Sequence, residues 1–322
     1  MNEHPPRNLA LDLVRVTEAA ALAAGRWMGL GEMDKANEEA GLAMWQALNS
    51  LDMDGHIVVG EEGRLGIHSN LDSGEPVGSG HGPAMDVLVD PIDGRDLLAR
   101  GHPDVISVAA VAPRGSVWDP AAAIYMDKMI VNREVADALV PECLDAPAAW
   151  TLALIARAKG KSVRDLVVFV LDRPRHEDLI REIRAAGART MLRTDGEVIG
   201  ALMAASPRGS VDVMMGIGGV SEAILAACAT KALAGGMLAR VTPQSATELE
   251  AVQAAGLDLR RVLTCDEIIT SNDIFFAATG ITNGSLLAGV HYHGQEAETQ
   301  SLVVRAESRT RRFIRSEYWF AE

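Results

Sequence analysis

Aromatic residues, cysteines and net positive charge are all scarce in this chain, and each shortage narrows the functions that it can have. Phe, Trp and Tyr make up only 4% of the 322 residues, so the hydrophobic 48% must build a core mainly from Ala, Val, Leu and Ile. The formal charge of −14 argues against a general nucleic-acid-binding protein, and we expect no nucleic acid as a partner. An anionic substrate remains compatible with this charge where arginines or metal ions gather locally.

Cysteine patterns and long hydrophobic runs are equally rare. Cys143, Cys228 and Cys265 are widely spaced and form neither a CxxC motif nor a disulfide framework, which indicates a reducing compartment. No hydrophobic run reaches the roughly 18 residues that a membrane span requires. The N-terminal residues show no signal-peptide pattern. We therefore expect a cytoplasmic protein without a membrane partner.

Strand-like and helix-like segments alternate along the chain, and this alternation predicts an α/β fold. Hydrophobic periodicity predicts helices at 9–28, 36–50, 177–186, 195–205 and 221–234. Buried strands are predicted at 57–59, 86–90, 105–112, 166–171, 188–192, 211–215 and 272–277. The length suits one large α/β domain or two fused halves.

Segment 86–95 carries the strongest chemical signal. Strand periodicity places Asp86 and Asp90 on one face of an apolar run, and Pro91 predicts a break and a turn that swings Asp93 back toward Asp90. Clustered carboxylates at the end of a buried strand repel one another, and a divalent cation removes that cost. Oxygen ligands favour Mg²⁺ or Mn²⁺ over Zn²⁺. The alternative is a polar turn made of ordinary turn residues.

Two further acidic sets lie at the ends of predicted elements. Glu61 and Glu62 directly follow a predicted strand, and Glu222 follows a glycine-rich turn at a helix start. Taken singly, the first pair can be exposed loop residues, and the third can simply favour the helix dipole. Taken together with Asp90 and Asp93, they predict a site for two or three metal ions assembled at one edge of a sheet.

The second half of the chain carries groups suited to a phosphorylated sugar. Arg173 and Arg175 flank Pro174 after a buried strand, where two guanidinium groups can bind a phosphate, although surface arginines paired with acids are the alternative. Segment 195–197 opens a helix and can take sugar hydroxyls or act as an ordinary N-cap. Segment 216–219 resembles a phosphate-cradling loop, but it lacks the full GxGxxG pattern.

In their order and spacing, these segments resemble the class II fructose-1,6-bisphosphatases, some of which, in photosynthetic organisms, also hydrolyse sedoheptulose-1,7-bisphosphate. The resemblance runs from about Leu11 to Arg315. The segments that carry it are 15–23, 59–61, 90–94, 124–128, 173–176, 195–197, 216–219 with Glu222, and 277–282.

The resemblance implies a layered sugar-phosphatase sandwich of alternating α and β layers, with an acidic half at about 1–160 and a sugar-phosphate-binding half at about 161–322. It implies metal-dependent hydrolysis of the 1-phosphate of a sugar bisphosphate, in gluconeogenesis or the Calvin cycle, with Mn²⁺ or Mg²⁺ as cofactor. A homodimer or homotetramer is expected on the same ground. The implied metal ligands are Asn37, Glu61, Asp90, Asp93 and Glu222; the implied catalytic residues are Asp90, Asp93 and Arg95. The implied substrate contacts are Asp93, Gly94, Arg95, Tyr125, Arg173, Arg175, Asp195, Glu197 and Gly219.

Three positions depart from the family pattern. Arg95 stands where the family usually has a Thr that helps to orient the attacking water, and Arg cannot act as a general base. Asn37 aligns with an acidic ligand, with Asp34 or Glu38 as substitutes if the register shifts. The acid that usually lies two residues past the first Glu is displaced by one position. These departures keep two alternatives open: a catalytically impaired sugar-phosphate-binding or regulatory paralogue, and a phosphatase of altered sugar specificity.

Overall fold

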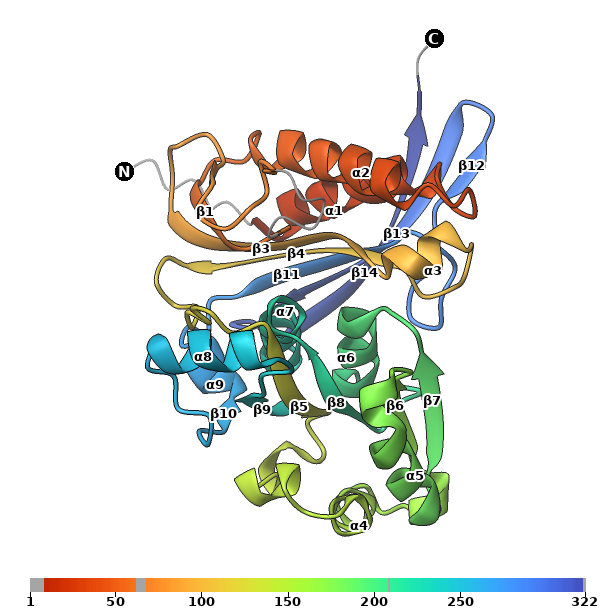
Figure 1. Ribbon diagram of the computed structural model, residues 1–322. Coiled ribbons are helices and arrows are strands. Elements are labelled where there is room, and N and C mark those ends of the chain that lie inside the picture. The colour runs from red at the N-terminus through yellow and green to blue at the C-terminus, as the bar shows by residue number, and fades with distance from the viewer. Residues whose placement is uncertain (1–8, 62–67, 208, 321–322) are drawn as a thin grey trace. The chain divides into compact units, whose positions relative to one another are not determined.

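A computed structural model describes residues 9–61, 68–207 and 209–320 of the protein (Figure 1). The chain divides into two compact units, Met1–Gly115 with Asp273–Glu322 and Ser116–Asn272. This division differs from the contiguous halves expected around residue 160. The reason is that β11 (Phe275–Gly280) hydrogen-bonds to β4 (Ile106–Pro113), which returns the C-terminal segment to the first sheet.

The first unit is a sheet covered on one face by two long helices (Figure 1). Its strands are β1 (Asp54–Val59), β2 (Pro76–Val77), β3 (Ala84–Asp93), β4, β11, β12 (His291–His293), β13 (Glu296–Arg305) and β14 (Thr310–Trp319). Its helices are α1 (Leu9–Gly25), α2 (Met33–Leu48) and the short α3 (Arg95–Ala99). The strand order is β12-β13-β11-β4-β3-β1-β2, with β14 paired to β13. Val87 and Val89 of β3 join the core beneath α1 and α2, as expected for alternate residues of a half-polar strand.

Strand β3 corrects one prediction about the acidic segment. Pro91 does not break the strand, which continues to Asp93 through a one-residue bulge: Asp90 pairs with Val108, but Asp93 pairs with Ile106. Because those two partners are two residues apart on β4, they share a face of the sheet, and so do the residues opposite them. The bulge, rather than a turn, therefore brings Asp93 to the face of Asp90.

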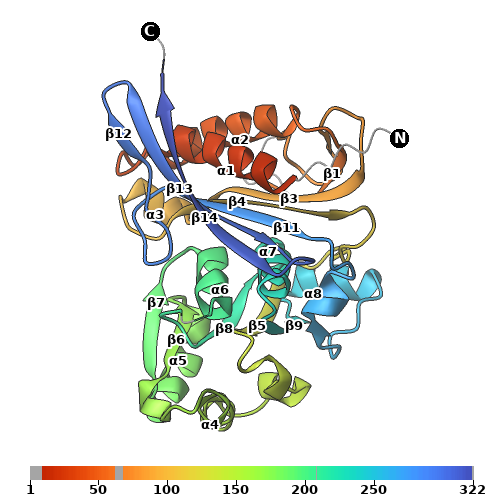
Figure 2. The same ribbon diagram turned by 180° about the vertical axis from the view of Figure 1, so that it is seen from behind.

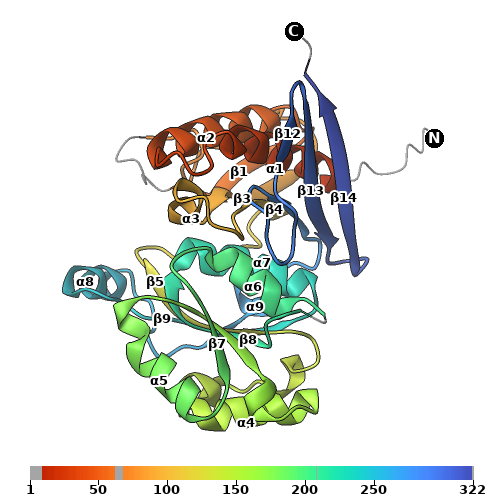
Figure 3. The same ribbon diagram turned by 90° about the vertical axis from the view of Figure 1, so that its right-hand side faces the viewer.

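The second unit is a three-layered α/β structure, as Figures 2 and 3 show. Its sheet order is β10-β9-β5-β8-β6-β7. The strands are β5 (Tyr125–Val131), β6 (Val167–Leu171), β7 (Arg189–Arg193), β8 (Val213–Gly219), β9 (Gly236–Val241) and β10 (Leu263–Thr264). The helices are α4 (Ala148–Lys159), α5 (Glu177–Ala185), α6 (Glu197–Ala205), α7 (Val220–Ala232), α8 (Ala246–Ala254) and α9 (Cys265–Ile268). Short 3₁₀ turns are η1 (Ala136–Ala138), η2 (Pro141–Leu144), η3 (Val163–Asp165) and η4 (Pro174–His176).

Alternation along β5 decides which side chains face which helix layer. Met129 and Val131 join the hydrophobic core formed with α4 and α5. Lys128, between Met129 and Asp127, takes the opposite face and pairs with Glu197 at the start of α6. The predicted α/β class is confirmed in both units. All three cysteines are buried without a disulfide, and no helix in the described part of the chain is long and apolar enough to cross a membrane.

Candidate functional site

The acidic residues of the first unit are buried. Glu61 follows β1, and Asp90 and Asp93 lie in β3, each with no more than 3% of its surface exposed. The backbone N–H of Ile92, inside the bulge, donates a hydrogen bond to Asp90 Oδ1 over 3.1 Å. Burying a carboxylate is costly unless a hydrogen bond or a positive charge compensates it. These three carboxylates are thus held where a cation would be favoured.

Asn37, rather than a neighbouring acid, contacts this group. Asp34 and Glu38 are exposed on α2, whereas Asn37 is 2% exposed, so the shifted register is not adopted. The Asn37 amide nitrogen donates to Glu61 Oε2 over 2.5 Å. Its carbonyl oxygen Oδ1 is buried and has no hydrogen-bond partner among the residues described. Asn37 and Glu61 line a cavity of about 250 Å³, to which His68 also contributes.

These observations test whether the chain suits a divalent metal. The donors are carboxylate oxygens and one unsatisfied amide oxygen, which is the chemistry that Mg²⁺ or Mn²⁺ prefers. Within the described ranges, however, no three His, Cys, Asp or Glu side chains converge closely enough to hold an ion by themselves. The donor types fit the predicted metal, and the full set of ligands stays a prediction. Glu62, also named from the sequence, lies outside the described residues.

Gly94 and Arg95 connect this group to a helix. Gly94 has φ 102° and forms the N-cap of α3, a left-handed conformation that glycine adopts without steric cost. Arg95 is the first residue of that helix, two positions after Asp93, and it is half-buried. Its guanidinium thus enters the chain immediately after the acidic strand.

In the second unit, the structure brings together two predicted substrate contacts. The Arg175 guanidinium carbon lies 5.3 Å from the centroid of the Tyr125 ring, a cation–π contact. Arg175 also donates its Nε–H to the Ile217 carbonyl over 3.1 Å. Arg173 opens the same 3₁₀ turn, and both arginines are exposed. Their exposure is what a site for a soluble anion requires.

A second cluster joins Glu197, Gly219 and Glu222 around a residue that the sequence reasoning missed. Lys128, 1% exposed, forms an ion pair with Glu197, and its Nζ donates to the Gly219 carbonyl over 3.4 Å. Burial raises the pKa of Glu197; Lys128 opposes this effect, and the nearby Glu222 adds to it. The available signal was a lysine alternating with apolar residues in a strand, because a lysine there must find a buried partner.

The glycine-rich segment 216–219 is not a loop, because β8 continues to Gly219 and pairs with β5. A Cβ on Gly218 would collide with the Glu197 carboxylate, and one on Gly219 would collide with that of Glu222. The glycines thus make room for two carboxylates beside the backbone.

The two remaining predicted residues lie at helix starts. The N-cap of α6 is Gly196, with φ 84° and no side-chain hydrogen bond, so the N-cap role considered for segment 195–197 is not filled by Asp195, which is half-buried. Glu222 lies in the first turn of α7 and is half-buried. The predicted residues are thus divided: Asn37 to Arg95 belong to the first unit, and Tyr125 to Glu222 belong to the second.

Buried oxygen donors in one α/β unit, and an exposed arginine pair in the other, define the class of metal-assisted phosphate-processing proteins. The family model described as bacterial fructose-1,6-bisphosphatase, glpX-encoded, matches residues 7–318, and the chain belongs to this family. It is a family of phosphoric monoester hydrolases. The resemblance found in the sequence is thereby confirmed.

Curated relatives agree over nearly the whole length. A fructose-1,6-bisphosphatase class 2 from Haemophilus influenzae is 38% identical over 97% of this chain and 96% of its own. Fructose-1,6-bisphosphatase 1 class 2 from Escherichia coli K12 is 36% identical with the same coverage. Among solved structures, the extragenic suppressor protein SuhB from Bartonella henselae covers 61% of this chain and 74% of its own, at 12% identity. Its TM-score of 0.33 is too low to carry an argument.

Proposed function

We propose that this protein hydrolyses the 1-phosphate of fructose-1,6-bisphosphate in a metal-dependent reaction. The family match over residues 7–318 supports the substrate class. The observation that carries the chemistry is the bulge in β3, which directs two buried carboxylates, Asp90 and Asp93, to one face of the sheet. Two carboxylates held in this way favour a hard divalent cation.

In this proposal Asn37, Glu61, Asp90, Asp93 and Glu222 hold Mn²⁺ or Mg²⁺. When bound, such an ion polarises phosphoryl oxygens and lowers the pKa of a water molecule. Phosphoryl transfer depends mainly on positioning and on stabilisation of charge.

The remaining predicted residues then act on the substrate. Arg95 provides a permanent positive charge to the reacting phosphate, because it cannot accept a proton. Arg173 and Arg175 bind the distal phosphate. The sugar contacts are Tyr125, Asp195 and Glu197, together with the backbone at Gly94 and Gly219.

Phosphate release from purified protein tests the proposal. Fructose-1,6-bisphosphate is titrated with Mn²⁺ and separately with Mg²⁺, and the assay is repeated with sedoheptulose-1,7-bisphosphate. We expect turnover that requires the metal. The absence of release from either sugar, with binding still measured by calorimetry, would instead support the sugar-phosphate-binding paralogue.

One contact favours that second candidate. The Asn37 amide occupies Glu61 Oε2 at 2.5 Å, where an acidic ligand would leave the carboxylate to the metal. If the site is impaired, the double variant Asn37→Asp/Arg95→Thr should raise turnover by about tenfold, because it adds a charged ligand and a hydroxyl near the metal. An active parent enzyme whose double variant is no faster would exclude the impaired paralogue.

Arg175→Ala provides a test of the distal-phosphate role. The loss of a charge-assisted contact should raise KM for the bisphosphate by about tenfold or more and leave metal affinity unchanged. Arg181→Ala is the matched control, because Arg181 is an exposed arginine that pairs with Asp178 on α5. A fall in metal affinity measured by calorimetry for Arg175→Ala would contradict the assigned role.

The compartment and assembly also belong to this proposal. Three buried cysteines without a disulfide support a reducing cytoplasm. A homodimer or homotetramer is proposed from the family resemblance, and light scattering during size-exclusion chromatography measures it directly.

A further inference from the structure

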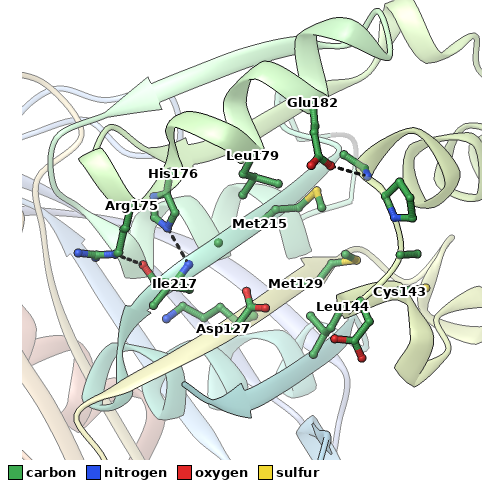
Figure 4. Close-up of a pocket in the computed structure, with 16 residues that line it drawn as sticks. Asp127, Met129, Cys143, Leu144, Arg175, His176, Leu179, Glu182, Met215 and Ile217 are labelled. Atoms are coloured by element: carbon green, nitrogen blue, oxygen red, sulfur yellow. Dashed lines mark hydrogen bonds between the residues drawn. The ribbon is translucent and has the colours of Figure 1, made fainter. Parts of the chain in front are cut away.

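The 3₁₀ turn η4 holds both backbone groups of one residue in the neighbouring strand β8 (Figure 4). The N–H of Ile217 donates to His176 Nε2 over 2.8 Å, and the Ile217 carbonyl accepts from Arg175 Nε over 3.1 Å. Strand β6 pairs with β8 only as far as Met214. Beyond that point, two consecutive side chains replace the missing backbone partners of β8.

This arrangement determines the proton on His176. Because Nε2 accepts from Ile217, it carries no hydrogen, so Nδ1 carries the hydrogen and donates to the Leu171 carbonyl over 2.7 Å. The ring is 2% exposed and spans the end of β6 and the middle of β8. Gly216, with φ 126°, leaves space for it, since a Cβ there would lie 2.9 Å from Nε2. The imidazole is therefore held as one neutral tautomer.

The consequence falls on Arg175. Its Nε is directed at Ile217, and its guanidinium lies beside the Tyr125 ring, so the two terminal nitrogens have a defined direction. An exposed arginine on a short turn would otherwise lose side-chain entropy on binding an anion. The contacts around His176 set that direction before any ligand arrives.

We propose that His176 is a positioning residue, which holds η4 against β8 so that the Arg175 guanidinium is oriented for the distal phosphate of the substrate. The inference rests on the proposed function, because that function assigns the phosphate to Arg175. His176 itself touches no reacting atom.

His176→Phe tests the proposal, since Phe fills much of the ring volume without either nitrogen. We expect KM for fructose-1,6-bisphosphate to rise about tenfold while kcat changes less than about twofold, because a pre-oriented contact is lost without a change in the chemical step. His176→Gln, which keeps a donor and an acceptor, should recover most of the affinity. It also serves as the test variant if His176→Phe does not fold. A Gln variant as weak as Arg175→Ala would overturn the proposal.

A double variant shows whether the effect passes through Arg175. In the Arg175→Ala background, His176→Phe should raise KM no further, because the group that it positions is absent. Equal rises in both backgrounds would overturn the proposal.

A measurement independent of activity separates this inference from the proposed function. In ¹⁵N nuclear magnetic resonance spectra, the Ile217 amide and the Arg175 Nε–H should be protected from exchange in the parent protein and exposed in His176→Phe. Loss of protection supports the positioning role even if no bisphosphate is hydrolysed, in which case only the proposed function fails. Unchanged protection of the Arg175 Nε–H overturns the positioning role.

Discussion

Asp90→Asn should reduce metal-dependent phosphate release by about a hundred- to a thousandfold, because a neutral amide at this position removes part of the several kcal/mol that a bound metal contributes. Folding should survive the change, since Asn retains the acceptor oxygen for the Ile92 N–H and removes a buried charge. Phosphate release measures the first effect, calorimetric titration with Mn²⁺ measures the loss of metal affinity, and urea unfolding checks the fold.

Asp86→Asn is the matched control for this experiment. Asp86 is also a buried carboxylate of β3, four residues before Asp90 and on the same face by strand alternation. Because it is assigned no ligand role, its replacement should change turnover less than about threefold. Equal losses for both variants would show that the strand needs acidic residues for its structure and would contradict the metal role of Asp90.

Lys128→Met should produce the largest loss of stability, lowering the free energy of unfolding at neutral pH by about 3–5 kcal/mol. The ammonium group of Lys128 is fully buried against Glu197, and its removal leaves a buried carboxylate without that counter-charge. The double variant Lys128→Met/Glu197→Gln should recover most of this loss, because the amide is neutral and can still accept the hydrogen bond from the Gly219 N–H. Urea unfolding of both variants measures the difference.

The pH dependence of that loss has a defined sign. Burial raises the pKa of Glu197 above 4.5 in the folded protein, so between 4.5 and the raised value the folded state binds more protons than the unfolded state. Stability therefore falls as pH rises through this window. Removal of Lys128 raises the pKa further, so the cost of Lys128→Met should be greatest near pH 7.5 and smaller near pH 5. A cost that is independent of pH and unchanged in the double variant would contradict the buried ion pair.

Some elements were predictable because their patterns are local. Helix α1 was expected at 9–28 and is found at Leu9–Gly25, and β6 was expected at 166–171 and is found at Val167–Leu171. Both have dense hydrophobic residues in one clear period. The last three strands, β12 to β14, were not predicted. Their polar and charged residues hide the alternation, and they are ordered by pairing with β13 and β11.

The site divides in the same way. Asp90, Asp93, Arg175 and Tyr125 could be named in advance because their short motifs keep a recognisable spacing. The bulge that aligns Asp90 with Asp93 could not be read from those motifs, since it depends on the register of β3 against β4. Lys128 and Glu197 lie 69 positions apart, and no local pattern links them.

The sequence by itself determined the α/β class, the order of the acidic and basic motifs and, through that order, the family. Tertiary structure alone decided that Asn37, rather than Asp34 or Glu38, meets Glu61, and that the chain divides after Gly115 and after Asn272. The physical reason is the range of the forces involved. Periodicity and turn chemistry act over a few neighbouring residues, whereas strand register, buried charge pairing and the exclusion of water are decided by segments that meet only in the folded protein.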